Sequence, residues 1–259
     1  MTDKILARKD GAIGWLTFNN PERRNAVSLE MWQAIPSVLD DFGKDPNIRA
    51  VVLSGAGDKA FASGADISQF EKERASREQV ARYDQISEKA QAALEGLDKP
   101  LIAMIRGYCI GGGLNVANLA DLRIAADDAR FGIPAAKMGL GYRAPSMKKL
   151  VDLVGKAYAL EIMITARQFT AAEAKEMGLV HRVVPVPDLE KVTREYCAMI
   201  AANAPLTMRA SKRIIREVAR GNYDAAACGA WVKECFDSED YAEGRRAFME
   251  KRRPAFKGR

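Results

Sequence analysis

Two glycine-centred segments contain the residues whose types and spacing best suit chemistry. They are residues 61–66 (FASGAD) and residues 111–115 (GGGLN), and each follows an apolar, strand-like run. Glycine has no Cβ and tolerates unusual dihedral angles, so the main chain can approach a ligand closely there. If both segments meet at one carbonyl oxygen, their N–H groups form an oxyanion hole. A glycine triplet on its own is more often a tight turn, so it is the pair that indicates a site.

The second segment is especially suited to this role. Residues 114–120 are predicted to be helical, so the glycines place N–H groups at a helix N-terminus, where the macrodipole favours negative charge. Loss of one oxyanion donor costs an enzyme about 2.7 to 4 kcal/mol of transition-state stabilisation. Two donors therefore supply a large part of a catalytic effect.

Alternating strands and helices are expected to position these segments. Residues 12–18 and 122–125 are typical of strands, and the apolar runs 50–53 and 101–105 are typical of strands covered on both faces. Ser28 is a natural N-cap for a helix that ends at Gly43, and Ser76 with Gln79 forms a capping box for a helix that runs towards Gly96. The order strand, glycine segment, helix occurs twice. This repeat predicts a layered α/β core.

Helices dominate after Arg143. They are predicted over residues 146–154, 156–164, 170–177 and 188–202, and three more follow from Pro205. The change from mixed α/β to all-α near residue 198 predicts two parts. These are an α/β core of residues 1–197 that contains the site, and a C-terminal helical region of residues 198–259 that packs on its own core or on a neighbouring subunit.

Composition excludes several classes of site. The four cysteines have no CxxC spacing, and the one histidine, His181, leaves no Cys/His metal set, so we expect no metal. Neither a leader nor an 18-residue apolar run occurs, which predicts a cytoplasmic protein without a membrane span. Much of the net charge of +6 follows Pro205, but without an aromatic-interleaved basic motif. Nucleic acid is therefore an unlikely partner, and a phosphate-bearing small ligand or a solvated helix face is preferred.

Five motifs in series resemble those of the enoyl-CoA hydratase/isomerase (crotonase) family. They are residues 20–26 (NPERRNA), 59–67 (KAFASGADI), 107–113 (GYCIGGG), 121–125 (DLRIA) and 174–180 (AKEMGLV). The resemblance implies a crotonase-like spiral of repeated β-β-α units. It also implies C-terminal helices that form homotrimers, often paired into hexamers, and an acyl-CoA ligand with no cofactor beyond its CoA moiety.

The resemblance also implies site residues. The oxyanion donors would be the N–H groups of Ser63 and Gly112, and Asp66 would mainly orient its own loop or cap the next helix. Basic side chains would approach the CoA phosphates, although each could be an ordinary surface charge. The full set of expected CoA contacts is Arg23, Arg24, Ala26, Lys59, Ala65, Asp66 and Phe256.

The chain differs from hydratases of the family at two positions that carry catalytic residues in those enzymes. Asn115 and Ala135 stand where hydratases of the family carry two glutamates. Hydration needs a base to activate water and an acid to protonate carbon, and neither an amide nor a methyl group titrates. We therefore expect poor conventional hydration, with Asn115 holding a water or a substrate oxygen.

Other side chains near this segment are candidates to replace the glutamates. Tyr142 is similar in position to a pocket tyrosine of methylmalonyl-CoA decarboxylase, a branch of the same family, although a packing role is also open. Lys137 and Arg143 lie close by in sequence and could simply be solvated. His181 lies far from both segments in sequence and is expected to be a surface or packing residue.

Three hypotheses follow, with a weaker fourth. The first is an acyl-CoA enzyme of fatty acid metabolism, a lyase or isomerase that stabilises a thioester enolate. The second is a decarboxylase of a 2-carboxyacyl-CoA, in which Tyr142 and Asn115 orient the carboxylate. The third is a non-catalytic acyl-CoA-binding protein that lost its acids. RNA binding is the weak fourth, because it depends only on the basic C-terminal region.

Overall fold

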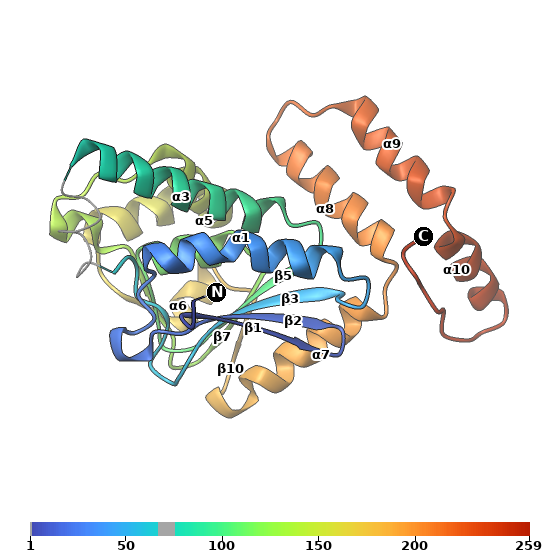
Figure 1. The fold of residues 1–259 in the computed structure, drawn as a ribbon, viewed down its shortest axis with the longest axis horizontal. Helices are drawn as coiled ribbons and strands as arrows, with labels where there is room; N and C mark the ends of the chain where they lie inside the picture. The colour runs from blue at the N-terminus through green and yellow to red at the C-terminus, as the bar shows by residue number, and fades with distance from the viewer. Residues whose placement is uncertain (1, 67–75) are drawn as a thin grey trace.

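A six-stranded sheet forms the centre of the protein (Figure 1). The computed structural model describes residues 2–66 and 76–259. The first strand of the sheet is antiparallel to the second, and all the others are parallel. In spatial order the strands are β1 (Ile5–Asp10), β2 (Ile13–Phe18), β3 (Ala50–Gly55), β5 (Leu101–Ile105), β7 (Leu122–Ala126) and β10 (Arg182–Val184).

Four short strands form a second sheet. They are β4 (Ala60–Ala62), β6 (Tyr108–Ile110), β8 (Arg130–Gly132) and β9 (Phe169–Thr170), in that spatial order. Each of the first three follows a strand of the large sheet and precedes a helix: α3 (Arg77–Gly96), α4 (Gly112–Asn118) and α5 (Ala144–Thr165). The strand, strand, helix unit therefore occurs three times, which confirms the predicted spiral of β-β-α units.

Both faces of the large sheet are buried. Successive side chains along a strand point to opposite faces, so each strand contributes to two apolar clusters. Val51 and Leu53 belong to the apolar cluster that includes α1 (Leu29–Lys44) and α3. Ala50 and Val52 belong to a second cluster, with Trp15 and with α7 (Leu189–Ala201). This is the period of two that a strand imposes. In Figure 1, α1 and α3 lie over one face of the sheet and α7 lies on the other.

Most predicted helix boundaries are confirmed. Ser28 caps α1, which continues one residue past the predicted end at Gly43, and the capping box of Ser76 with Gln79 opens α3. The two helices predicted over residues 146–154 and 156–164 form α5, which is interrupted at Gly155 by a φ of 72°. The predictions missed β1, β10 and the short strands of the second sheet. A three-residue strand has too few positions to show a period.

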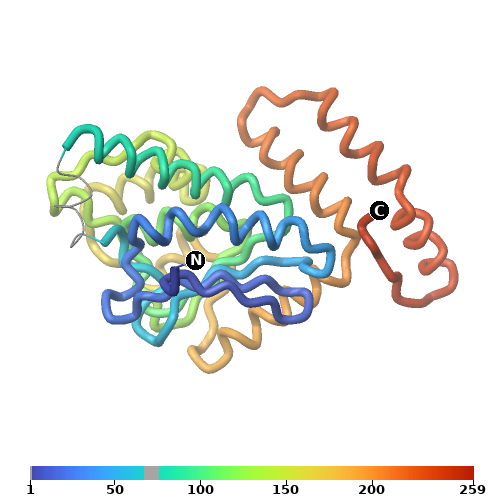
Figure 2. Tube along the Cα trace, in the orientation of Figure 1, coloured from blue at the N-terminus to red at the C-terminus, as the bar shows by residue number. Residues whose placement is uncertain are grey.

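The predicted C-terminal helices are present and lie to one side of the core (Figures 1 and 2). They are α8 (Pro205–Ala219), α9 (Ala225–Phe236) and α10 (Glu239–Met249). Three ion pairs between described residues join α8 to the core: Lys212 with Asp121 at 2.5 Å, Arg213 with Asp98 at 2.6 Å and Arg216 with Asp121 at 3.7 Å. The expected division after Cys197 falls within α7, whose Cys197 is buried against the sheet. We therefore propose that the helical region begins at α8.

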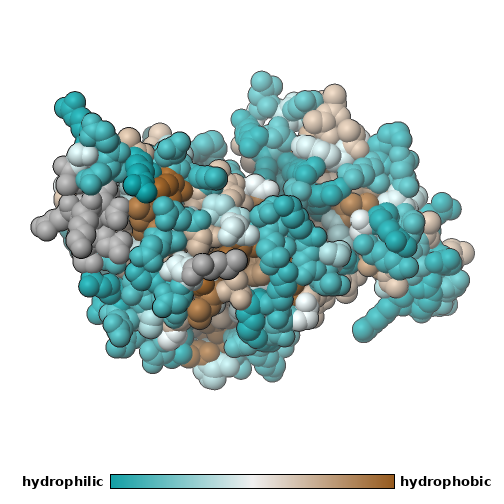
Figure 3. Space-filling model, viewed as in Figure 1, coloured by the Kyte–Doolittle hydropathy of each residue, from teal (hydrophilic) through white to brown (hydrophobic). Residues whose placement is uncertain are grey.

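Apolar side chains of the C-terminal helices are exposed. Phe248 and Met249 of α10 are 82% and 80% exposed, and Phe236 of α9 is 57% exposed. In Figure 3, apolar atoms on this part of the surface gather between α8 and the two helices that follow it. A groove of about 640 Å³ lies there, lined by residues of all three helices.

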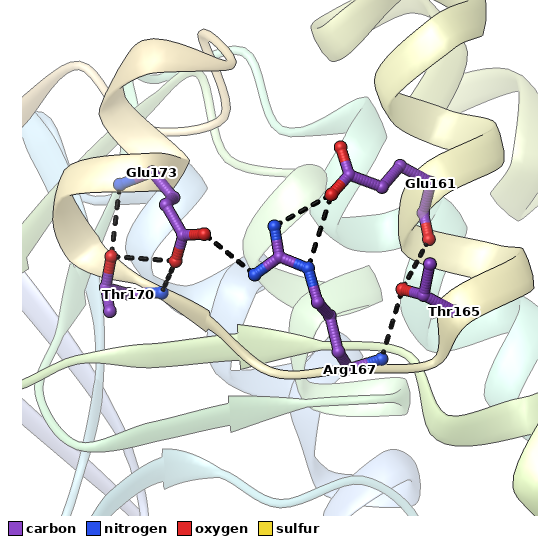
Figure 4. Close-up of polar contacts among 5 residues, drawn as sticks. All are labelled: Glu161, Thr165, Arg167, Thr170 and Glu173. Atoms are coloured by element: carbon purple, nitrogen blue, oxygen red, sulfur yellow. Dashed lines mark hydrogen bonds and ion pairs between the residues drawn. The ribbon is translucent and has the colours of Figure 1, made fainter.

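Arg167 ties the end of α5 to α6 (Ala171–Glu176) through two carboxylates (Figure 4). Its guanidinium pairs with Glu161 at 2.8 Å and with Glu173 at 2.7 Å. Glu173 also accepts hydrogen bonds from the main-chain N–H and the hydroxyl of Thr170, which closes the predicted capping box. Thr170 belongs to β9, which pairs with β8. The cluster therefore supports the edge of the smaller sheet.

Glu173 should give this corner of the fold a measurable pH dependence. The Thr170 N–H first, and then Arg167, lower the Glu173 pKa from 4.5 to about 2. Because the pKa is depressed in the folded state, the stabilisation is complete above about pH 4.5 and is lost as the pH falls through about 2. In thermal melts, Glu173→Gln should lower the Tm at neutral pH, and the difference from the wild type should shrink between these two values.

Glu176→Gln is the matched control for that series. Glu176 lies on the same helix, is exposed, and has no ion pair within the described residues. Its variant should follow the wild type across the whole pH range. A Tm difference for Glu173→Gln that stays constant down to pH 2 would contradict the role assigned to this carboxylate.

Candidate active site

Three neighbouring parallel strands end at the candidate site. β4, β6 and β8 pair in parallel, with Ala62 opposite Cys109 and Cys109 opposite Phe131, and the register between β4 and β6 shifts by one residue before Ala62. Because the carboxyl ends of parallel strands lie at one edge of a sheet, the segments that follow these strands are brought together. The N–H of Gly111 donates to the carbonyl of Gly132 at 2.8 Å, which joins the second glycine segment to the end of β8.

The two glycine segments are in direct contact. A Cβ on Gly113 would lie 2.1 Å from the carbonyl oxygen of Ala62, so only glycine allows α4 to pack this closely on β4. A Cβ on Gly112 would lie 3.6 Å from the nitrogen of Ala65 and from main-chain atoms of Gly64. Gly64 itself has a φ of +106°, which other residues rarely adopt. The structure thus confirms that the two segments converge.

Ser63 does not have the free N–H that was predicted for it. Its main-chain N–H donates to the carbonyl of Arg24 at 3.0 Å, and its hydroxyl donates to the carbonyl of Arg23 at 3.2 Å. Both donors of Ser63 therefore hold the first glycine segment against residues 23–24. An N–H committed to a carbonyl is not available to a ligand, so the assignment of Ser63 as an oxyanion donor needs correction.

Ala65 has the donor that Ser63 lacks. Val27 donates to the carbonyl of Gly64 at 2.8 Å, and Asp66 donates to the carbonyl of Val27 at 3.2 Å, so Val27 and Ala65 form a parallel bridge. In such a bridge the N–H of the central residue points away from the partner strand. Within residues 2–66 and 76–259, the N–H groups of Ala65 and Gly112 both have no hydrogen-bond partner.

Asn115 and Tyr142 lie near each other beside these donors. The Oδ1 of Asn115 and the hydroxyl of Tyr142 are both buried and form no hydrogen bond within the described residues. Burial raises the pKa of Tyr142 to about 12, and nearby Asn115 partly opposes this shift. The phenol is therefore neutral at physiological pH. Ala135 is buried in the short 3-10 helix that follows β8, Pro134–Met138, and adds no polar group.

The residues expected to contact CoA gather around the first glycine segment, with one exception. Arg23 pairs with Asp66 at 3.6 Å, and the guanidinium of Arg24 lies 4.8 Å from the ring centre of Tyr108. Lys59 is exposed just before β4. Ala26 is buried next to Asn25, whose amide donates to the carbonyls of Ala56 and Ala60 and so fixes this turn.

Phe256 is the exception. Its carbonyl accepts a hydrogen bond from Arg49, which directly precedes β3. The basic residues lie instead near the carboxyl end of β3, where Gly55 contacts Asn25. Six residues of strand span about 20 Å, so within one chain Phe256 lies apart from the glycine segments. A contact between Phe256 and CoA stays a prediction.

Two of the remaining candidate residues, Arg143 and His181, have structural partners. Arg143 pairs with Asp84 and Glu88 of α3, which ties the Tyr142 segment to that helix. The Nδ1 of His181 accepts the main-chain N–H of Arg123, and burial lowers the His181 pKa, so the packing role expected for His181 is confirmed. Lys137 is exposed.

Sequence analysis missed Asn118, which lies one turn after Asn115 on α4. Its side chain is only 6% exposed, and neither amide atom has a hydrogen-bond partner within the described residues. An unpaired buried amide costs about 1 to 3 kcal/mol. Asn115 and Asn118 both line a cavity of about 180 Å³ between α3, α4 and α5. The signal available in the sequence was the i, i+3 spacing of two amides in an otherwise apolar helix.

The described residues, 2–66 and 76–259, contain neither a candidate metal site nor a candidate membrane span. No group of three or more His, Cys, Asp or Glu side chains there is arranged to hold a metal ion. None of the helices in those ranges has both the length and the apolar character needed to cross a membrane.

Comparisons with known proteins agree with one another. The family model described as Enoyl-CoA hydratase/isomerase matches residues 8–259. The Short-chain-enoyl-CoA hydratase of Clostridium acetobutylicum is 34% identical over 260 residues, with 99% of each chain covered. The crystal structure of an enoyl-CoA hydratase/carnithine racemase from Magnetospirillum magneticum superposes with a TM-score of 0.93 at 36% identity. It covers 100% of this chain and 97% of that one.

Two adjacent glycines allow a matched test of this packing. Gly113→Ala places a methyl group against the Ala62 carbonyl, and such overpacking should cost about 1 to 3 kcal/mol of unfolding free energy. Gly112→Ala makes only ordinary contacts in a helical position, where alanine is favoured by up to about 1 kcal/mol. Denaturant unfolding should therefore show a destabilised Gly113 variant and an unchanged or stabilised Gly112 variant. Equal effects would mean that the segments are not packed as described.

Proposed function

The chain belongs to the enoyl-CoA hydratase/isomerase family, and from that premise we propose an acyl-CoA enzyme that holds the thioester oxygen between the N–H groups of Ala65 and Gly112. The observation that carries this proposal is that two unpartnered main-chain donors lie on segments in contact. When an enolate forms, negative charge develops on the thioester oxygen. Each donor aimed at that oxygen lowers the barrier by about 2.7 to 4 kcal/mol.

The CoA portion would lie along the exposed side of the first glycine segment. Arg23, Arg24 and Lys59 are exposed there, and a guanidinium matches the geometry of phosphate oxygens. Ala65 and Asp66 would border the thioester end of the same path. We propose no cofactor besides the CoA moiety of the substrate.

The side chains of Asn115 and Ala135 limit the possible reaction, because neither of them is an acid or a base. An amide and a methyl group cannot take or give a proton near neutral pH, so water addition by an acid and base pair is not available at these positions. Relatives named hydratases support the substrate class rather than this step. We therefore propose that hydration of crotonyl-CoA is slow in this protein.

Decarboxylation of a 2-carboxyacyl-CoA is the second candidate reaction. It is favoured by the buried, unpartnered hydroxyl of Tyr142, which can donate a hydrogen bond to a carboxylate, and by nearby Asn115, whose amide nitrogen can donate a second one. The bond between C2 and the carboxylate carbon breaks and carbon dioxide leaves. Its electron pair becomes the enolate, whose oxygen is held by Ala65 and Gly112, and a solvent proton then adds to C2. No catalytic base is needed.

The exposed apolar groove of the C-terminal helices supports a proposal for assembly. Phe236, Phe248 and Met249 leave much apolar surface in water, and such surface usually marks a contact with another protein. We propose that a second copy of the chain covers it, in a trimer or hexamer.

A non-catalytic acyl-CoA-binding protein would keep the same surfaces and the same ligand path.

A substrate panel distinguishes an enzyme from a binding protein. With methylmalonyl-CoA, crotonyl-CoA and butyryl-CoA followed by mass spectrometry, we expect carbon dioxide release or exchange of an α-hydrogen with solvent deuterium, and slow hydration. Tyr142→Phe should reduce decarboxylation more than exchange, since it removes only the hydroxyl. Binding of all three thioesters with no turnover would support the non-catalytic alternative.

Restoring the two carboxylates tests why hydration is slow. Asn115→Glu with Ala135→Glu should increase crotonyl-CoA hydration by about 10²- to 10⁴-fold, the usual contribution of general acid and base groups. Asn115→Glu alone should give a smaller gain, because one of the two proton transfers still lacks its group. Rapid hydration by the unmodified protein, or no gain in a folded double variant, would argue against this explanation.

A further inference from the structure

The cavity beyond Asn115 contains a polar group that the proposed chemistry does not use. Asn118 follows Asn115 by three residues, so the two amides lie on the same face of α4. A helix rises about 1.5 Å per residue, which places Asn118 about 9 Å along α4 from Gly112. An acyl chain whose thioester oxygen is bound at Gly112 would thus pass Asn115 before its far end meets Asn118.

A single bridging water does not account for this space. The cavity has a volume of about 180 Å³, whereas one water takes up about 30 Å³ in the liquid. Its walls come from three helices and include Gln91 of α3 as well as Asn118 of α4. Asn118 offers two donors and one acceptor oxygen, and all are unused within the described residues.

The charged residues around the cavity are already paired. Glu88 pairs with Arg143 at 2.8 Å, and Glu95 pairs with Lys149 at 2.5 Å. A charged group on the ligand would find no uncommitted counter-charge on these side chains, and burying it unpaired would be unfavourable. A neutral group that both donates and accepts hydrogen bonds matches Asn118 better.

We propose that Asn118 selects acyl-CoA substrates that carry a neutral hydrogen-bonding group, a hydroxyl or an amide, several carbons from the thioester. This inference rests on the proposed function, because it takes the thioester position from Ala65 and Gly112. It adds a class of acyl group to that function. A plain hydrocarbon chain in this cavity would leave the Asn118 amide unpaired.

Binding measurements with matched thioesters test the inference without requiring turnover. Calorimetric Kd values are compared for hexanoyl-CoA with 6-hydroxyhexanoyl-CoA, and for octanoyl-CoA with 8-hydroxyoctanoyl-CoA. We expect the hydroxylated member of at least one pair to bind about tenfold more tightly. Asn118→Leu should abolish this preference. Gln91→Leu, a matched change on another helix of the cavity wall, should preserve it.

The outcomes separate this inference from the proposed function. If no thioester binds to the wild-type protein, both the function and the selection by Asn118 are overturned. If the plain chains bind as tightly as the hydroxylated ones, or if folded Asn118→Leu keeps the preference, the inference alone is overturned. A preference lost in Asn118→Leu and kept in Gln91→Leu supports it.

Discussion

The close approach of α4 to β4 is the constraint on which the site depends. The carbonyl of Ala62 occupies the space that a side chain at residue 113 would need, so the helix can sit against the strand only because Gly113 has none. Parallel pairing of β4, β6 and β8 delivers the segments to one edge, and this contact sets the spacing between them. The two candidate donors are main-chain N–H groups, so their positions are fixed by the sheet and do not depend on flexible side chains.

Much of the fold could be predicted from local patterns. Capping residues such as Ser28 and Ser76 stabilise only the adjoining turn of helix, and a buried run such as residues 50–53 lies within one strand. Both signals are local, so both can be recognised in the sequence. The short strands of the second sheet were missed because their stability comes from pairing with residues distant in the chain. The position of Phe256 could not be predicted for the same reason: nothing local in the sequence places it beside Arg49.

The site was predicted at the level of its segments but not of its atoms. Which N–H is free depends on the direction in which each peptide points, and that direction is set by Val27, far from both segments in sequence. A motif therefore locates the turn, while only the bridge between Val27 and Ala65 distinguishes Ala65 from Ser63. Asn118 could not be recognised as a candidate from the sequence, because only the structure shows that its buried amide has no hydrogen-bond partner within the described residues.

The C-terminal helices join the core at the amino ends of the central strands, through Asp98, Asp121 and Arg49. The glycine segments follow the opposite, carboxyl ends of the neighbouring strands. Changes on the outer surface of α9 and α10 therefore need not be transmitted to the reacting atoms. Substitutions can therefore accumulate on that far side of the molecule while the geometry of the glycine segments is preserved.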